Sequence, residues 1–364
     1  MKIDESFLFD NLRKFYGCLT CYNHTGYMFP PIRYFLELTY RCNLNCSFCY
    51  INHERTKDEM TTKEWFNIID QIPFYSFISL VAGEVMIRKD FFEILEKASK
   101  KNGGKISIIT NGILLNEHAI KELIRNNVLL LSISLDGYKE HHDELRERKN
   151  LWNNIITNLE LLNEEKEKQK KKRPMLDIKS VVLENNLDDL PLIYKEASRL
   201  NASFFSLSFK RNCFLRQNSE QAEVFGEEFY KQEYPLEMYF DKEHFCEVYK
   251  ELESIAKTSK TKLRWAPKFK PTGDLERILK YFELGNKPVK EIYHPCYVPF
   301  SNVFITPEGD VYPCLSYKLG NIRGKNIQEV LNNPKYKEFR QMMKKHKIFN
   351  ACQTCCDAFP RKDF

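Results

Sequence analysis

The sequence predicts an α/β protein: a partial (β/α)6 barrel of TIM-like type, followed by a small α+β domain. Two observations predict this class. Six apolar runs rich in β-branched residues alternate with longer segments of helical spacing between residues 34 and 211, and such alternation is typical of a parallel sheet covered by helices. After residue 291 the pattern changes to short runs, turns and clustered cysteines. Six units are too few for a closed eight-stranded barrel, so a partial barrel or an open sheet is expected.

The expected strands and helices alternate along the chain. Strands are expected at residues 34–40, 77–83, 105–112, 128–137, 176–184 and 203–209. Helices are expected between them, at residues 61–72, 90–101, 116–127, 151–169 and 188–200. Thr61 or Thr62 with Glu64 is typical of a helix start, and Asn102-Gly103-Gly104 is typical of a helix end.

Polar motifs stand where four of the expected strands end. They are Cys42, Gly83-Glu84, Asn111-Gly112 and Asp136-Gly137. The carboxyl ends of parallel strands form the active-site face of such folds, so we expect these motifs to lie on one face. Gly, Asn and Asp are ordinary residues in turns after strands, so only the cysteine motif demands a chemical explanation.

The remaining chain divides by composition. Residues 212–291 are rich in charged and aromatic residues and predict a mainly helical insert, whose aromatic side chains either cap the barrel or form a local core. "PEGD" (307–310) between two apolar runs predicts a β-hairpin. The expected units are an N-terminal extension (1–33), the barrel (34–211), the insert (212–291) and the C-terminal domain (292–364).

Composition narrows the cellular compartment and the classes of binding partner that we expect. The net charge of +6 comes from 56 basic and 50 acidic residues, and the basic run at 166–173 is interpreted as a solvated helix end, so a nucleic-acid partner is not favoured. No signal peptide and no stretch of 18 apolar residues is evident, so we expect a cytoplasmic protein without a membrane partner. In that reducing compartment, the twelve cysteines are expected to be metal ligands or reactive thiols.

Cys42, Cys46 and Cys49 have the spacing C-x3-C-x2-C. Three thiolates on a loop after a strand can bind three irons of a [4Fe–4S] cluster and leave the fourth iron open. Zinc with His53 as a fourth ligand is the alternative, although zinc sites favour paired C-x2-C units.

With Phe48, these cysteines resemble the C-x3-C-x-aromatic-C signature of the radical SAM enzymes, and the resemblance covers residues 34–211. It implies that the open iron binds S-adenosylmethionine. It also implies that the reduced cluster gives this molecule one electron, which produces a 5′-deoxyadenosyl radical that takes hydrogen from a substrate. A flavodoxin- or ferredoxin-type protein would then supply the electron.

The same resemblance implies further contacts to S-adenosylmethionine. Phe48 would face the adenine, and Ala82-Gly83-Glu84-Val85 stands where the family has Gly-Gly-Glu-Pro against the methionine amino group. Ala82 and Val85 depart from that pattern, which leaves room for altered cofactor geometry. The expected cofactor-binding residues are Phe48, Ala82, Gly83, Glu84, Asn111, Ser134 and Asp136.

The C-terminal cysteines resemble the twitch domain, a shorter relative of the SPASM domain. The match consists of Cys296, Gly309 and Cys314 in order, followed by the pair Cys352 and Cys355. The resemblance implies one auxiliary [4Fe–4S] cluster held by these four cysteines, with zinc as the alternative.

Five cysteines remain: Cys18, Cys21, Cys213, Cys246 and Cys356. Cys213 follows the sixth expected strand. Because some radical SAM epimerases use a cysteine as hydrogen-atom donor, Cys213 is a candidate catalytic residue. Cys356 could replace Cys355 as a ligand, and a buried inert thiol is the simplest interpretation of each of the others.

The leading functional hypothesis is therefore a radical SAM oxidoreductase that modifies a peptide or a small biosynthetic intermediate. Only 33 residues precede the first expected strand, too few for a peptide-recognition domain, which weakens the peptide interpretation. Two alternatives stay open. One is an RNA- or nucleotide-modifying enzyme, suggested by the net charge, and the other is a cluster- or zinc-binding regulatory protein without radical chemistry, suggested by Ala82 and Val85.

Overall fold

The structure is a computed structural model. It describes residues 15–19, 25–49, 51, 58–210, 238–283, 289–314, 318–353 and 355–362. In these residues one sheet has the strand order β10-β9-β8-β1-β2-β3-β4-β5-β6-β7. The strands are β1 (Arg33–Glu37), β2 (Phe77–Val81), β3 (Ile106–Thr110), β4 (Leu130–Ser134), β5 (Met175–Val182), β6 (Phe204–Phe209), β7 (Lys262–Ala266), β8 (Asn302–Ile305), β9 (Asp310–Tyr312) and β10 (Gly320–Asn321).

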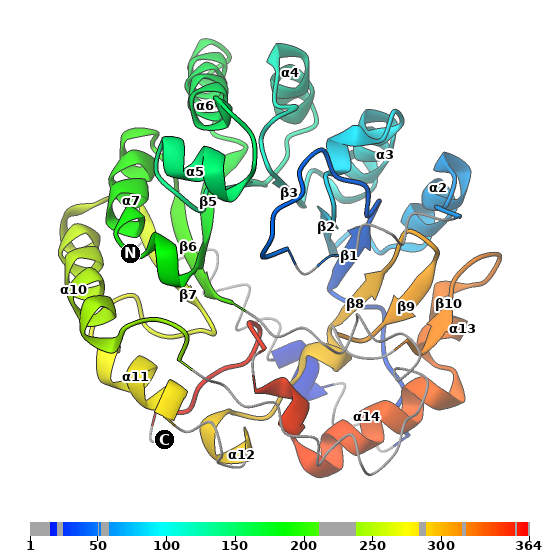
Figure 1. The fold of residues 1–364 in the computed structure, drawn as a ribbon. Coiled ribbons are helices and arrows are strands. Elements are labelled where there is room, and N and C mark those ends of the chain that lie inside the picture. Colours follow the sequence, from blue (N-terminus) through cyan, green and yellow to red (C-terminus); the bar gives the residue numbers. More distant parts are fainter. Residues whose placement is uncertain are drawn as a thin grey trace.

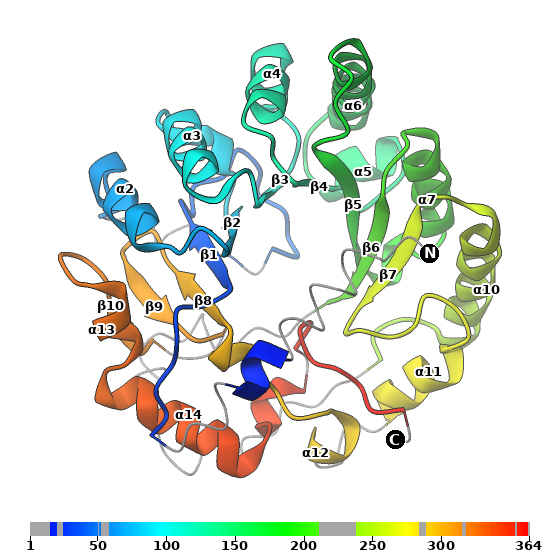
Figure 2. The ribbon, with the colours of Figure 1, turned by 180° about the vertical axis from the view of Figure 1, so that it is seen from behind.

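Helices cover the outer side of this curved sheet (Figures 1 and 2). They are α2 (Thr62–Gln71), α3 (Phe91–Asn102), α4 (Glu117–Arg125), α5 (Glu140–Leu145), α6 (Leu151–Lys168), α7 (Asp189–Arg199), α10 (Lys242–Thr258), α11 (Leu275–Glu283), α12 (Val289–Ile292), α13 (Ile327–Leu331) and α14 (Pro334–His346). From β8 through β1 to β7, each strand pairs in parallel with the next in the sheet order. β9 pairs antiparallel with both β8 and β10. β7 and β10 end the sheet without pairing to each other, which confirms the predicted partial barrel.

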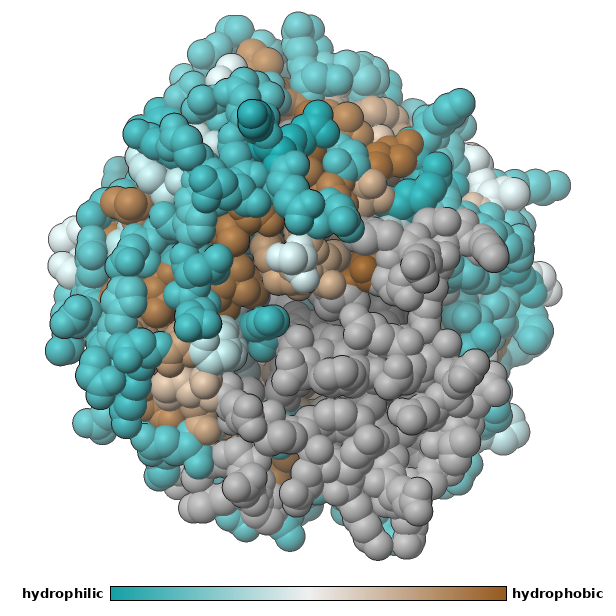
Figure 3. Space-filling model, viewed as in Figure 1, coloured by the Kyte–Doolittle hydropathy of each residue, from teal (hydrophilic) through white to brown (hydrophobic). Residues whose placement is uncertain are grey.

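Local sequence signals explain where the helices begin and end. Thr61 caps α2 in a reciprocal capping box with Glu64, as the sequence predicted. α3 ends at Gly103 in the left-handed conformation (φ 68°). Apolar side chains of the strands and helices meet between the two layers, and in Figure 3 the outer faces of the helices are mainly hydrophilic, with hydrophobic residues in the seams between them.

The structure places a strand in the region where the sequence predicted mainly helices. β7 pairs in parallel with β6 and extends the barrel beyond six strands. Its five residues, Lys-Leu-Arg-Trp-Ala, alternate between buried and less buried positions, so they form no continuous apolar run. Beside this strand the aromatic side chains form a local core, in which Phe209, Phe240, Phe245 and Trp265 stack or pack edge to face.

The C-terminal domain continues the barrel sheet. β8 lies beside β1 in parallel, with Phe35 and Phe304 stacked at 4.1 Å between ring centroids. β8 and β9 form the predicted hairpin around residues 307–310, and α13 and α14 follow it. Among the described residues no helix is long and apolar enough to cross a membrane.

Candidate functional site

The three cysteines lie on the loop that follows β1, at the carboxyl end of the strand. All three side chains are half-buried, and the Cys49 amide donates a hydrogen bond of 3.0 Å to the Cys46 carbonyl. Burial raises the pKa of the Cys42 and Cys46 thiols in the metal-free chain, and the charge of Arg146 opposes this shift. The site therefore holds soft sulfur ligands beside a cation that favours their ionised form.

Two side chains, one from the end of β3 and one from the residue after α5, reach these thiols. The Asn111 amide Nδ2 lies 3.8 Å from Cys42 Sγ, and Arg146 Nη1 lies 3.4 Å from Cys46 Sγ. The Arg146 guanidinium also lies over the Phe48 ring, 5.4 Å from its centroid. Asn111 thus lies beside Cys42 and Phe48 beside Arg146, while the expected contacts of both residues to S-adenosylmethionine stay predictions.

Arg146 is a site residue that the sequence analysis missed. It directly follows α5, with only 12% of its side chain exposed. Its guanidinium forms a salt bridge with Asp136, whose other carboxylate oxygen accepts a 2.7 Å hydrogen bond from the Val181 amide. Asp136 is 1% exposed. In the structure, Asp136 therefore positions Arg146. The expected contact of Asp136 to S-adenosylmethionine stays a prediction.

His142 supports the same strand end. Its Nδ1 accepts a 3.2 Å hydrogen bond from the Asp136 amide. Burial, followed by repulsion from Arg146, lowers the pKa of His142 to about 3. The imidazole is therefore neutral at physiological pH and serves as an acceptor for the backbone.

Glu84 joins the ends of β2 and β3 from a fully buried position. Its carboxylate accepts hydrogen bonds from the Thr110 hydroxyl and from the amides of Asn111 and Met86. Burial raises the pKa of Glu84, and these donors oppose the shift. Glu84 thereby fixes the backbone of Asn111, while its expected contact to the methionine amino group stays a prediction. Ser134 ends the adjacent strand β4, paired in register with Lys179.

The turn after β2 contains two consecutive residues in the left-handed conformation. Ala82 and Gly83 both have positive φ, 75° and 51°, a conformation that favours glycine. A Cβ on Gly83 would lie 2.4 Å from the Arg41 carbonyl oxygen, so the turn packs directly on the start of the cysteine loop. The Glu84 amide in turn donates a 2.9 Å hydrogen bond to that carbonyl.

We expect Ala82→Gly to be neutral or to stabilise the protein by up to about 1 kcal/mol, because it relieves left-handed strain. Ala98→Gly, inside α3 and fully buried, is the matched control and should cost about 1 kcal/mol or more. Chemical denaturation of the two variants checks the opposite signs. Equal destabilisation by both would show that Ala82 is not strained.

A second group of cysteines gathers in the C-terminal domain. Burial raises the pKa of the Cys352 thiol, and the nearby Cys296 and Cys314 raise it further. A hydrogen bond with Cys356 and burial raise the pKa of Cys355, with Cys352 close by. Cys352 therefore lies near Cys296, Cys314 and Cys355, the other three cysteines expected as auxiliary ligands, and Cys356 is the hydrogen-bond partner of Cys355.

Buried tyrosines hold the loop between Cys352 and Cys355. The Tyr281 and Tyr293 hydroxyls both donate to the Gln353 carbonyl, at 3.0 and 2.7 Å. Tyr293 also lies at the start of the C-terminal domain, in a bridge to Pro360. A cavity of about 190 Å³ lies beside this group, lined in part by Cys296.

The donor sets fit iron–sulfur clusters. Among the described residues, no three His, Cys, Asp or Glu side chains lie close enough to bind one metal ion. A [4Fe–4S] cluster has its thiolates on separate irons, so its ligands need not converge on one point. Thiolates are the ligands that such clusters take, and N–H donors near the sulfurs are typical of their surroundings.

The remaining candidates lie elsewhere. Cys213, the candidate hydrogen-atom donor, and Cys21 fall outside the described residues. Cys18 and Cys246 are half-buried, the latter on α10.

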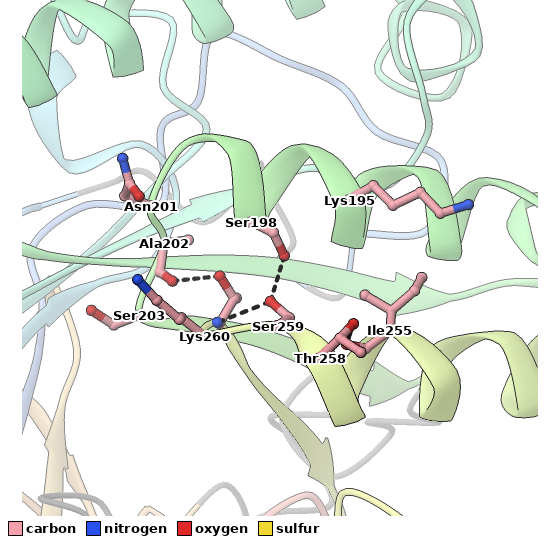
Figure 4. Close-up of a pocket in the computed structure, with 10 residues that line it drawn as sticks. Lys195, Ser198, Asn201, Ala202, Ser203, Ile255, Thr258, Ser259 and Lys260 are labelled. Atoms are coloured by element: carbon pink, nitrogen blue, oxygen red, sulfur yellow. Dashed lines mark hydrogen bonds between the residues drawn. The ribbon is translucent and has the colours of Figure 1, made fainter.

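A larger cavity of about 530 Å³ lies at the other end of the barrel (Figure 4). It is lined by residues before β6 and β7 and by the last turns of α7 and α10, with Ser198, Ser259 and Thr261 linked by hydrogen bonds. These residues precede the strands, whereas the cysteines follow one. The cavity is therefore not part of the cysteine site.

Comparison with known proteins identifies both parts of the chain. The model of the radical SAM superfamily matches residues 36–177, and that of an iron–sulfur cluster-binding domain, SPASM, matches residues 296–356. The chain therefore belongs to the radical SAM superfamily of enzymes and carries a C-terminal domain of the SPASM type. The cofactors of these two domains are S-adenosylmethionine and [4Fe–4S] clusters.

Several known proteins are similar to this chain. The sporulation killing factor maturation protein SkfB of Bacillus subtilis (strain 168) is 26% identical over 178 residues, which cover 48% of this chain and 42% of that protein. The AdoMet-dependent heme synthase of Methanosarcina barkeri (strain Fusaro / DSM 804) is 24% identical over 328 residues, 88% of this chain and 86% of that protein.

Among solved structures, Streptococcus suis SuiB bound to its precursor peptide SuiA superimposes with a TM-score of 0.64 at 15% identity. The match covers 93% of this chain and 73% of that one. This likeness shows that the two proteins share a fold.

Proposed function

We propose that this protein is a radical SAM oxidoreductase that cleaves S-adenosylmethionine at Cys42, Cys46 and Cys49 and modifies a peptide or a small biosynthetic intermediate. The observation that carries the proposal is the surroundings of these thiols. Arg146 and Asn111 each place an N–H donor near one of them, and Phe48 lies against Arg146.

Each site residue has a task in this proposal. Cys42, Cys46 and Cys49 would hold three irons of a [4Fe–4S] cluster, and S-adenosylmethionine would bind the fourth. The reduced cluster would supply one electron that breaks the sulfonium C–S bond, which gives methionine and a 5′-deoxyadenosyl radical able to take hydrogen from a substrate. Arg146, held by Asp136, keeps a positive charge at this end of the barrel for the cofactor carboxylate.

The C-terminal thiols support a net oxidation of the substrate. Cys296, Cys314, Cys352 and Cys355 are four candidate ligands, enough for a fully ligated second cluster that accepts the electron left on the substrate. A flavodoxin- or ferredoxin-type protein is the proposed donor to the first cluster. We place the protein in the cytoplasm, where thiols stay reduced.

Three similarities support the two proposed substrate classes. SkfB is a maturation protein, and SuiB was solved with a precursor peptide, which supports a peptide. The AdoMet-dependent heme synthase, which matches most of this chain, supports a small biosynthetic intermediate. Incubation with candidates of both classes, followed by mass spectrometry for loss of hydrogen, would separate them.

The first test is anaerobic reconstitution followed by reduction with dithionite in the presence of S-adenosylmethionine. We expect about eight irons per chain and the release of 5′-deoxyadenosine. Cys46→Ala should abolish 5′-deoxyadenosine while leaving the auxiliary iron, because Cys46 belongs to the first site alone. Cys246→Ala, a half-buried thiol on α10, is the control and should retain both iron and product. A fully loaded wild type that releases no 5′-deoxyadenosine would refute the proposal.

Neither alternative gains support from the structure. Gly83 and Glu84 pack on the Arg41 carbonyl at the start of the cysteine loop although Ala82 and Val85 depart from the family pattern, so that departure does not favour a protein without radical chemistry. The described basic run at the end of α6 is largely exposed, and Lys168 pairs with Glu165, as expected for a solvated helix end. Steep salt dependence of tRNA binding would be needed to revive the RNA alternative.

A further inference from the structure

A network of charged and polar side chains connects the two ends of the cysteine loop. Glu59 lies at the far end of this loop. Its carboxylate accepts hydrogen bonds from two nitrogens of the Arg41 guanidinium, Nε at 3.3 Å and Nη2 at 3.0 Å. It also accepts one from the buried Thr39 hydroxyl. Arg41 comes directly before Cys42 and Thr39 three residues before it, so the Glu59 carboxylate connects the two ends of the segment that carries the three cysteines.

Arg88 also contacts the Glu59 carboxylate and holds it near the backbone at the end of β1. Its side chain is 6% exposed, and its Nη1 lies 3.4 Å from Glu59 and donates a 3.0 Å hydrogen bond to the Leu38 carbonyl. Its Nη2 donates to the Met60 carbonyl at 3.1 Å and to Asp90 at 2.8 Å. Arg88 therefore contacts the backbone on both sides of the loop and pairs with two carboxylates, which matches its burial.

Asp90 completes the charge balance around Arg88. Partial burial raises the pKa of Asp90, but hydrogen bonds from Arg88 and from the Thr62 hydroxyl outweigh this and leave the pKa below its usual value. Asp90 is therefore ionised at neutral pH, and Arg88 faces two anions, Asp90 and Glu59. We call Thr39, Arg41, Glu59 and Arg88 the clasp.

The C-terminal domain contacts Asp58 and Met60, the two residues on either side of Glu59 in the clasp. The Met60 amide donates a 2.7 Å hydrogen bond to the Pro307 carbonyl in the β8–β9 hairpin. Arg323, which follows β10, donates to both the carboxylate and the carbonyl of Asp58, with 3.0 Å to the carboxylate. Met60 is 1% exposed and lies against Gly309, where an added Cβ would come within 3.2 Å of its sulfur.

We propose that the C-terminal domain positions the cysteine loop of the barrel through this clasp, with Glu59 and Arg323 as positioning residues. The domain then has a role beyond its own cysteines, because it fixes where the three thiols of the first site stand. Closing the loop in the metal-free chain reduces the conformational freedom that would otherwise be lost when the thiols are gathered on a cluster. The link to clusters rests on the proposed function, whereas the clasp itself does not.

The test measures hydrogen–deuterium exchange in the cluster-free chain, in peptides that cover residues 42–49. Glu59→Gln and Arg323→Gln should each speed exchange there by about tenfold, because each removes charge-assisted hydrogen bonds that hold the loop. Exchange in β3 and α4 should stay unchanged. Glu117→Gln, an exposed carboxylate paired with Lys121 on α4, is the matched control and should leave the loop unaffected.

The double variant shows whether Arg323 acts through Glu59. If the clasp is one continuous unit, Glu59→Gln together with Arg323→Gln should speed exchange hardly more than either change alone. Additive effects would overturn the proposed coupling, and unchanged exchange at residues 42–49 in both single variants would overturn the clasp. Since no cluster is present, failure of the radical chemistry would leave this result untouched.

A second readout connects the clasp to the cofactors. In reconstituted protein, Glu59→Gln should lower the fraction of the first-cluster electron paramagnetic resonance (EPR) signal that changes when S-adenosylmethionine is added. Glu59→Asp keeps the charge and should partly restore that fraction. A wild-type response in Glu59→Gln would contradict a positioning role.

Discussion

Replacing Arg146 with methionine should lower the free energy of unfolding by about 3–5 kcal/mol and abolish cleavage of S-adenosylmethionine. The stability loss follows because Asp136 is 1% exposed and would be left as a buried carboxylate without its cationic partner. The loss of function follows because Cys46 and Phe48 would lose their contacts to the guanidinium. Denaturant titration of the metal-free chain and 5′-deoxyadenosine release measure the two effects.

The double variant Arg146→Met with Asp136→Asn separates these effects. With no charge left unpaired, the double variant should recover stability to within about 1 kcal/mol of wild type. It should still fail to cleave S-adenosylmethionine, because the positive charge is missing. A double variant that is as active as wild type would show that Arg146 serves only the stability of the fold.

Gly83→Ala should destabilise the protein by about 2–5 kcal/mol and displace the start of the cysteine loop. The residue has a positive φ, and its new Cβ would lie 2.4 Å from the Arg41 carbonyl and 2.7 Å from the Thr39 carbonyl. Backbone atoms cannot rotate away as a side chain can, so strain and overpacking add. Because Arg41 precedes Cys42, iron loading of the first site should also fall.

Gly324→Ala is the matched control for this variant. Gly324 has a similar φ of 66°, but nothing lies within 4 Å of the position where its Cβ would be. It should therefore cost only the left-handed strain, about 1–2 kcal/mol, without loss of iron. Equal costs for the two variants would mean that the contact between Gly83 and the loop is not tight.

Much of the fold and the cysteine loop could be predicted from the sequence, for identifiable reasons. The strands before residue 211 are apolar runs with distinct helical segments between them, and the capping box at Thr61 and the glycine at 103 are local signals. The cysteine spacing is also local, and it alone indicates a site for a [4Fe–4S] cluster. Such features depend on neighbours in sequence, which is why they could be seen without coordinates.

Contacts between distant segments could not be predicted. Arg146 comes one hundred residues after Cys46, on a charged segment with no spacing that marks it. β7 alternates in burial over only five residues and so gives no apolar run. Glu59 and Arg323 are ordinary surface-type residues in sequence, and only the pairing of β8 with β1 brings the C-terminal domain to the cysteine loop.

Cys213 stays a prediction, because it lies outside the described residues. The expected contacts of Ser134, Asp136 and Glu84 to S-adenosylmethionine also stay predictions. In the structure, Glu84 and Asp136 are engaged by the chain's own donors, which order the strand ends around the cysteines.

The most direct measurement is EPR spectroscopy of the reduced Cys296→Ala, Cys314→Ala double variant, recorded with and without S-adenosylmethionine. These substitutions remove two of the four proposed auxiliary ligands. The auxiliary cluster should then fail to assemble, which leaves the first site as the source of the [4Fe–4S] signal. We predict a signal whose g-values shift when S-adenosylmethionine is added, because the molecule binds the iron that the three cysteines leave open. A [4Fe–4S] signal that stays unchanged at saturating S-adenosylmethionine would contradict the assignment of Cys42, Cys46 and Cys49.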